Sequence, residues 1–238
     1  MILRPSPNFG DRKLPVTMAV IHYTGMRTAD AALDTLTSPA SGVSSHYMIA
    51  EDGTVFALVD EGKRAWHAGA GEWRGITDVN SASVGYELVN PGSEFGYTPF
   101  PEPQIAALVS LLRGAFARYA IRPANVIGHS DLAPTRKDDP GELFPWPMLA
   151  AAGLAARVPV SDNVPRGTPN GFEAAPDPGW TDAGATLALG RYGYGVADTK
   201  AALVAFQRHF RPSRVDGVWD AQSRGAARAA ARRGAVSA

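Results

Sequence analysis

The chain has 238 residues, of which 45% are hydrophobic, so it is long enough for one large folded domain and a small one and too apolar to be disordered throughout. Its 23 basic and 23 acidic residues balance to a formal charge of zero, which argues against a dominant role in binding nucleic acid or an anionic membrane. The absence of cysteine excludes a disulfide framework and any thiolate metal site.

The N-terminal segment, residues 1–8, lacks the apolar core and the small-residue cleavage site of a secretory signal. No stretch of the sequence approaches the roughly 18 consecutive apolar residues that a membrane-spanning helix needs. We therefore expect a cytoplasmic protein without a transmembrane segment. A periplasmic location stays open if a leader is missing from this sequence or if export is unconventional.

The first half of the chain alternates between strand-like and helix-like segments. Residues 18–23 form a short apolar run typical of a buried strand. Residues 28–38 have helical apolar spacing, with Thr28 as a candidate N-cap. Residues 45–50 and 54–59 flank Asp52-Gly53, a pair that tolerates positive φ and therefore predicts a hairpin.

The next segments complete an alternating pattern. Residues 83–89 and 125–128 read as strands, and residues 102–119 carry apolar side chains at helical spacing. The pattern predicts an α/β fold in which helices flank a mixed central sheet. His22, Glu87 and His129 would all lie at or near strand ends, where a shared sheet can bring them together.

The C-terminal third changes character. Residues 158–177 are rich in proline, glycine and asparagine without apolar periodicity, which is typical of a linker. Beyond them, residues 180–189, 198–210 and 221–232 predict three short helices, with Asp198 and Asp220 as N-caps. We therefore expect a main domain over residues 1–157, a linker over 158–178 and a small all-α three-helix domain over 179–238.

Two fragments more than a hundred residues apart carry the candidate metal chemistry. His22 lies in the first, and His129 lies in the second with Asp131, Asp138 and Asp139 close behind it. Two histidines and one aspartate can hold a zinc ion and leave its fourth position free for water, as catalytic zinc sites do. The alternative is that both histidines are merely hydrogen-bonded residues at strand ends. From the residues alone, the aspartates compete for the third position.

Glu87 and Lys137 are the other candidate catalytic residues. Strand alternation places Glu87 on the opposite face from Tyr86 and Leu88, and a charged group in an apolar strand requires a compensating environment. Lys137 precedes Asp139 by two residues and could bring an ammonium group beside it. The alternatives are a solvent-facing glutamate on an edge strand and a solvated lysine.

Five fragments between residues 20 and 146 occur in the order found in a known family. They are Val-Ile-His-Tyr-Thr, Val-Ser-Ser-His-Tyr-Met-Ile, Ala-Trp-His-Ala-Gly, Ser-Val-Gly-Tyr-Glu-Leu-Val-Asn, and the string from Gly128 to Gly141. Together they resemble the zinc-dependent N-acetylmuramoyl-L-alanine amidases of the type-2 group. The resemblance implies hydrolysis of the amide between N-acetylmuramic acid, or its 1,6-anhydro form, and L-alanine of peptidoglycan stem peptides, in cell-wall turnover or recycling.

The resemblance also implies roles for individual residues. Zn²⁺ would bind His22, His129 and Asp139, with Asp139 selected by the Lys-x-Asp-Pro spacing. Glu87 would act as the general acid/base and Lys137 would stabilise the oxyanion. The rival interpretation is a non-catalytic peptidoglycan recognition module on the same fold.

The remaining histidines and the C-terminal segment lie outside the candidate zinc ligands. We expect His67 to line the cleft and contact substrate, although a structural role fits equally; we expect His46 to be a hydrogen-bonded core residue and His209 to take no part in chemistry. Phe206-Gln207 and Asp216-Gly217 resemble a motif of the three-helix peptidoglycan-binding domain. We expect a monomer that binds peptidoglycan or an anhydro-muropeptide and no nucleic acid.

Overall fold

The computed structural model describes residues 1–158 and 181–234. The predicted linker therefore lies, apart from its first residue, outside the described residues. Among the described residues, no helix has the length and apolar character needed to cross a membrane.

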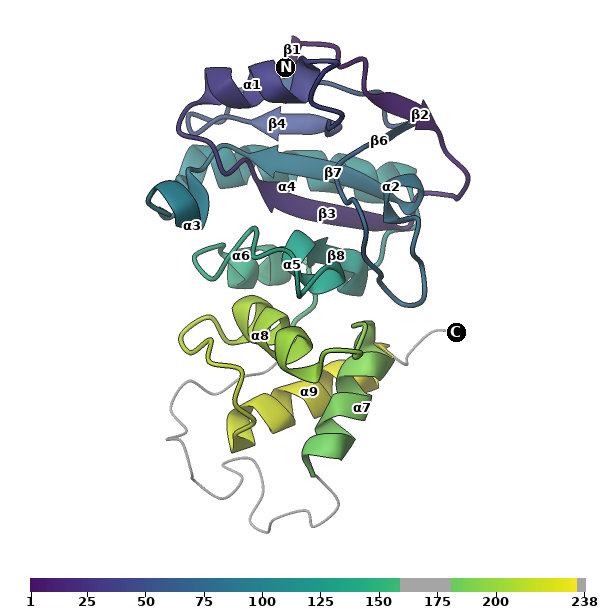
Figure 1. Cartoon of the computed structure of the whole chain (residues 1–238), viewed down its shortest axis with the longest axis vertical. Helices are drawn as coiled ribbons and strands as arrows, with labels where there is room; N and C mark the ends of the chain where they lie inside the picture. The colour runs from purple at the N-terminus through teal and green to yellow at the C-terminus, as the bar shows by residue number, and fades with distance from the viewer. Residues whose placement is uncertain (159–180, 235–238) are drawn as a thin grey trace.

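The strands build one large sheet and one small one (Figure 1). They are β1 (Ile2–Leu3), β2 (Phe9–Asp11), β3 (Met18–Tyr23), β4 (Tyr47–Ile49), β5 (Val55–Ala57), β6 (Lys63–Ala65), β7 (Ser83–Leu88) and β8 (Val126–Gly128). The large sheet has the order β1-β5-β4-β7-β3-β8, and β2 pairs with β6 separately. The β4–β5 pair is antiparallel, whereas β4, β7, β3 and β8 are mutually parallel, so the sheet is mixed as predicted.

The helices surround the large sheet and form a second layer below it. They are α1 (Ala29–Thr37), α2 (Val79–Ala82), α3 (Gly92–Phe95), α4 (Glu102–Arg118), the 3-10 turn η1 (Pro123–Asn125), α5 (His129–Leu132), α6 (Trp146–Ala151), α7 (Asp182–Tyr192), α8 (Thr199–Phe210) and α9 (Ala221–Gly234). In Figure 1, α4 lies behind the sheet and α7, α8 and α9 lie below α5 and β8.

Predicted helix caps and a predicted turn are present at the ends of several helices and strands. The Thr28 hydroxyl accepts a hydrogen bond from the Ala31 N–H at the start of α1, and the Asp198 carboxylate accepts one from the Ala201 N–H at the start of α8. Gly53 has φ +86 in the tight turn between β4 and β5. These observations confirm the predicted caps and the predicted hairpin, although the hairpin strands are shorter than expected.

The two faces of the large sheet have different environments. Ile21, Tyr86 and Leu88 lie in a buried apolar cluster with the inner face of α4. Met18 and Val20 belong to a second cluster, on the other face, which continues through Trp73 and Leu132 into α7, α8 and α9. The C-terminal helices therefore share a hydrophobic core with the sheet. Burial of this apolar surface stabilises the packing of the C-terminal helices against the sheet.

Candidate active site

The parallel strands β3, β7 and β8 end at one edge of the large sheet, and the candidate residues gather there. His22 is the fifth residue of β3 and pairs in register with Glu87 of β7. His129 follows the last residue of β8 and begins α5. Glu87 lies on the face opposite Tyr86 and Leu88, as strand alternation predicts. This edge therefore collects residues that are far apart in the sequence.

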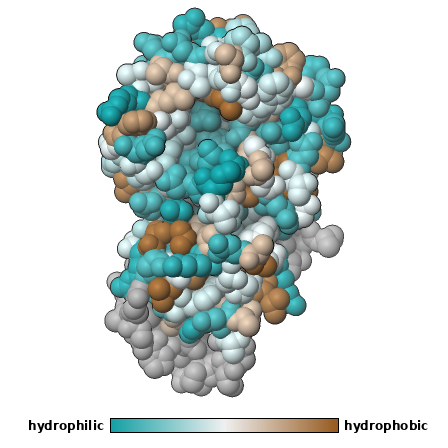
Figure 2. Space-filling model, in the orientation of Figure 1, coloured by the Kyte–Doolittle hydropathy of each residue, from teal (hydrophilic) through white to brown (hydrophobic). Residues whose placement is uncertain are grey.

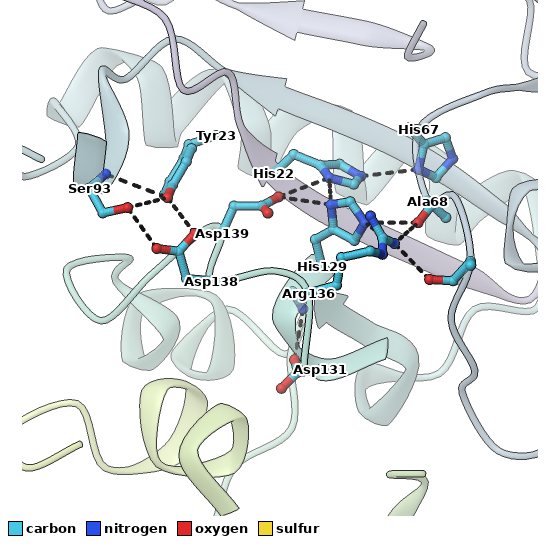
Figure 3. A network of polar contacts seen from close by, with 12 residues as sticks. His22, Tyr23, His67, Ala68, Ser93, His129, Asp131, Arg136, Asp138 and Asp139 are labelled. Atoms are coloured by element: carbon cyan, nitrogen blue, oxygen red, sulfur yellow. Dashed lines mark hydrogen bonds and ion pairs between the residues drawn. The ribbon is translucent and has the colours of Figure 1, made fainter. Parts of the chain in front are cut away.

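Three buried side chains converge at this edge (Figure 3). The Nδ1 atoms of His22 and His129 lie 3.0 Å apart, and the Asp139 Oδ2 atom lies 3.0 Å from the first and 3.2 Å from the second. Within residues 1–158 and 181–234, these three form the group whose ligand atoms could hold a metal ion. Of the competing aspartates, Asp139 points into this group and Asp131 and Asp138 do not.

A chain of hydrogen bonds defines which nitrogen of His22 carries the proton. The Ser83 hydroxyl donates to the Val79 carbonyl at 2.6 Å, so its oxygen is free to accept from His67 Nε2 at 3.3 Å. His67 Nδ1 must then accept the Nε2–H of His22, 3.0 Å away. His22 Nδ1 is therefore left with a lone pair that faces His129 and Asp139.

His129 has the same tautomer for a different reason. Its Nε2 atom lies 2.8 Å from the Ala68 carbonyl oxygen, to which only an N–H can donate. Its Nδ1 atom therefore also presents a lone pair. A tetrahedral zinc ion with bonds of about 2.0–2.1 Å sets its donor atoms about 3.3 Å apart. Two lone pairs and a carboxylate oxygen at the separations found here fit such a cation and would repel one another without it.

The charges around this group follow from burial and proximity. Burial, together with the nearby imidazole of His129, lowers the pKa of His22 to about 4, so its ring is neutral. Burial alone would raise the pKa of the Asp139 carboxyl, but a proton on the Nδ1 atom of His129 or His22 that faces Oδ2 holds this pKa below its ordinary value, and a bound cation takes the place of that proton. Histidine binds a metal ion as the neutral imidazole and aspartate binds it as the ionised carboxylate.

Glu87 and Lys137 line the same pocket as the three converging side chains. This pocket has a volume of about 560 Å³, and Figure 2 shows it as a mostly hydrophilic hollow in this face of the molecule. Burial and the Asp139 charge raise the pKa of Glu87 well above its ordinary value, although Lys137 opposes the shift. The Glu87 Oε2 atom is buried and accepts no hydrogen bond from the described residues.

Several residues near the site were not predicted, because their partners come from distant segments. Tyr23 and Ser93 donate to the two carboxylate oxygens of Asp138, at 2.6 and 2.7 Å, and so anchor the loop that carries Asp139. Gly85 leaves room for the His67 ring, since a Cβ atom there would lie 2.6 Å from it.

The other histidines are buried as well. The Gly85 N–H donates to His46 Nδ1 at 2.9 Å, which confirms His46 as a hydrogen-bonded core residue. His67 is only 8% exposed and bonds His22 and Ser83 through its two ring nitrogens. His209 of α8 is buried too, and its Nδ1 atom donates a hydrogen bond to Asp131.

Comparison with known proteins agrees with this arrangement. Residues 12–142 match the N-acetylmuramoyl-L-alanine amidase family. The chain is 39% identical to the N-acetylmuramoyl-L-alanine amidase AmiD of Escherichia coli K12, over 90% of this chain and 82% of that protein. It is 38% identical to the 1,6-anhydro-N-acetylmuramyl-L-alanine amidase AmpD of Enterobacter cloacae, over 46% of this chain and 56% of that protein.

Two solved structures share the fold over most of the chain. One is the E. coli amidase AmiD in complex with the substrate anhydro-N-acetylmuramic acid-L-Ala-D-γ-Glu-L-Lys, with a TM-score of 0.79 and 36% identity over 92% of this chain and 89% of that one. The other is AmpDh3 of Pseudomonas aeruginosa, with a TM-score of 0.79 and 33% identity over 93% of this chain and 94% of that one.

Proposed function

Because the chain belongs to the N-acetylmuramoyl-L-alanine amidase family, we propose that it is a zinc-dependent hydrolase that cuts the amide between N-acetylmuramic acid, or its 1,6-anhydro form, and L-alanine of peptidoglycan stem peptides. The observation that carries this proposal is the group of His22, His129 and Asp139, whose three donor atoms face one another in a pocket shared with Glu87 and Lys137.

His22 Nδ1, His129 Nδ1 and Asp139 Oδ2 are the proposed zinc ligands. Both imidazoles are held in the tautomer that turns a lone pair toward Asp139, and the carboxylate balances part of the cation's charge. A zinc ion bound there supplies Lewis acidity, which polarises the amide carbonyl and allows water to ionise near neutral pH.

Glu87 is the proposed general base and general acid. Its raised pKa brings the carboxyl closer to neutral pH, where one group can both take and return a proton. Its carboxylate takes the proton of the attacking water, and the same carboxyl then gives that proton to the departing amine nitrogen. The unpartnered Oε2 atom is available for both transfers.

Lys137 is the proposed oxyanion stabiliser. Lys137 lines the pocket, and its positive charge lowers the pKa of both Glu87 and His22. A preorganised positive charge beside the developing oxygen anion stabilises the tetrahedral transition state more than the planar amide.

The remaining expectations stay predictions. His67 lines the pocket as a predicted substrate contact, but because its ring nitrogens are occupied, such a contact would use its carbon edge. The division of the chain into a catalytic domain, a linker and a peptidoglycan-binding-like domain also stays a prediction. So do the cytoplasmic location, which cell fractionation tests, and the monomeric state, which light scattering tests.

The decisive experiment is mass spectrometry of products from purified anhydro-muropeptide and from intact sacculi, each with and without a chelator. We expect a free stem peptide that begins at L-alanine, lost on chelation and restored by zinc. The relative rates on the two substrates distinguish recycling from wall cleavage. No release by folded, zinc-loaded protein would contradict the proposal and favour a recognition module.

A further inference from the structure

A buried carboxylate joins the C-terminal helices to the candidate metal site. Asp131 is two residues beyond His129 and is 1% exposed. It accepts three hydrogen bonds, from the Gly128 N–H at 2.8 Å, the Tyr194 hydroxyl at 2.5 Å and His209 Nδ1 at 2.7 Å. The first donor precedes His129 directly, whereas the other two come from the C-terminal segment that contains α7 and α8.

The bond from Gly128 determines how the backbone enters His129. It closes the first turn of α5, so the Asp131 carboxylate fixes the peptide from which the His129 side chain projects. Another N–H of the same turn, that of Ser130, donates to the Asp139 carbonyl at 2.9 Å. The turn closed by Asp131 therefore supports two of the three converging side chains, His129 and Asp139.

The two donors from the C-terminal segment are themselves rigidly held. The His209 ring is stacked between Trp146, with ring centroids 3.7 Å apart, and Phe210, with centroids 4.0 Å apart. The Tyr194 ring packs edge-on against buried Trp73 at 5.0 Å, and the backbones of these two residues also form a bridge. Neither donor can turn away from Asp131 without breaking this packing.

A second connection reaches His129 from its other side. Trp73 lies in the loop after β6, which also carries Ala68, and the Ala68 carbonyl accepts the Nε2–H of His129. The Arg74 N–H donates to the Gly193 carbonyl at 2.9 Å, which binds this loop to the end of α7. The C-terminal segment thus contacts both the loop that sets the His129 tautomer and the turn that sets its backbone.

From these contacts we infer that Tyr194 and His209 are positioning residues for the metal site, acting through Asp131 on His129. The C-terminal helices then help to position a metal ligand, in addition to any role in recognising the cell wall. This inference rests on the proposed function, since it takes His22, His129 and Asp139 as zinc ligands.

The test uses the full-length protein and measures zinc affinity by competition with a chelating dye. Tyr194→Phe removes only a hydroxyl group, whereas His209→Leu removes the N–H donor together with the ring that stacks on Trp146 and Phe210. We expect each variant to bind zinc roughly 10- to 100-fold more weakly, the range found when outer partners of metal ligands are lost. His209→Asn, whose amide N–H can replace the Nδ1–H, should recover most of the affinity.

Ala227→Gly provides a matched control for lost stability. Ala227 is buried in α9, and glycine there weakens the helix without removing a donor to Asp131. We expect its melting temperature to fall while zinc affinity and the absorption spectrum of the cobalt-substituted protein stay as in the wild type. In Tyr194→Phe, by contrast, the cobalt spectrum should change.

The outcomes separate this inference from the proposed function. Wild-type zinc affinity and an unchanged cobalt spectrum in both Tyr194→Phe and His209→Leu would overturn the inference and leave the amidase mechanism intact. Equal loss of affinity in Ala227→Gly would also overturn it, because general destabilisation would then explain the effect. A wild-type protein that binds no zinc would overturn both proposals.

Discussion

Ser83→Ala should weaken metal binding although Ser83 touches none of the three proposed ligands. Its hydroxyl oxygen accepts from His67 Nε2, and His67 Nδ1 accepts from His22 Nε2. Without the hydroxyl, the buried N–H of His67 has no acceptor. The ring can avoid this cost by moving its proton to Nδ1. A proton on His67 Nδ1 would face the Nε2–H of His22, and two N–H groups cannot hydrogen-bond to each other. His22 must therefore move its own proton to the metal-facing Nδ1 atom.

The size of the effect follows from this competition. Metal binding requires an unprotonated His22 Nδ1 atom. In the variant, this protonation state leaves the His67 Nε2–H buried without a hydrogen-bond acceptor. An unsatisfied buried donor costs about 1–3 kcal/mol. The dissociation constant for zinc should therefore rise by a factor of about 5 to 150. The substitution removes one atom from a fully buried site, so no overpacking contributes to the change.

The assay is a competition titration of zinc between the protein and a chelating dye, at a temperature where all variants are folded. Ser6→Ala is the matched control, because Ser6 is also buried and donates to the Leu36 carbonyl at 2.6 Å but has no link to His22. It should lose stability without losing zinc affinity. If Ser83→Ala binds zinc as tightly as the wild type, the tautomer argument is wrong.

Three further predictions concern catalysis and pH. Glu87→Gln should retain zinc and lower kcat by about 10² to 10⁴, and a near-normal rate on anhydro-muropeptide would remove Glu87 from the mechanism. Lys137→Met should lower kcat by about 10² to 10³ with zinc content unchanged, and an effect confined to KM would contradict the oxyanion role. Burial lowers the pKa of His46 to about 4, below its unfolded value of about 6.5, so its contribution to stability is complete above pH 6.5 and is lost as the pH falls toward 4. In urea titrations of the metal-free protein, the free energy of unfolding should fall by about 3 kcal/mol over this pH range because of His46, and this contribution should be missing in His46→Asn. The same pH dependence of the unfolding free energy in both proteins would contradict the prediction.

Local signals predicted much of the fold. The apolar run of β3, the amphipathic pattern of α4 and the Asp-Gly turn between β4 and β5 each depend on neighbours in the sequence, and each is confirmed. The β2–β6 pair was not predicted, since both strands are three residues long and partly exposed, without apolar alternation.

Part of the candidate site was predicted from the sequence, and part of it was not. His22, Glu87 and His129 were expected together because strand ends meet at one edge of a sheet, and the structure brings them there. The link from Asp131 to His209 was not predicted, because it spans 78 residues and depends on how the C-terminal helices pack. No spacing rule encodes such a contact. The Ala68 carbonyl was also missed, since a backbone group leaves no trace in the sequence.

The order of these residues along the chain has a consequence during synthesis. His22 leaves the ribosome 107 residues before His129, and the donors to Asp131 follow later still, ending with His209 near the C-terminus. The three proposed ligands are therefore synthesised before the residues that hold Asp131 in place. Premature termination before α8 would yield a sheet with its three ligands but without the contacts that steady them. If the proposed zinc site depends on Asp131, its last supporting contact forms only after His209 has left the ribosome.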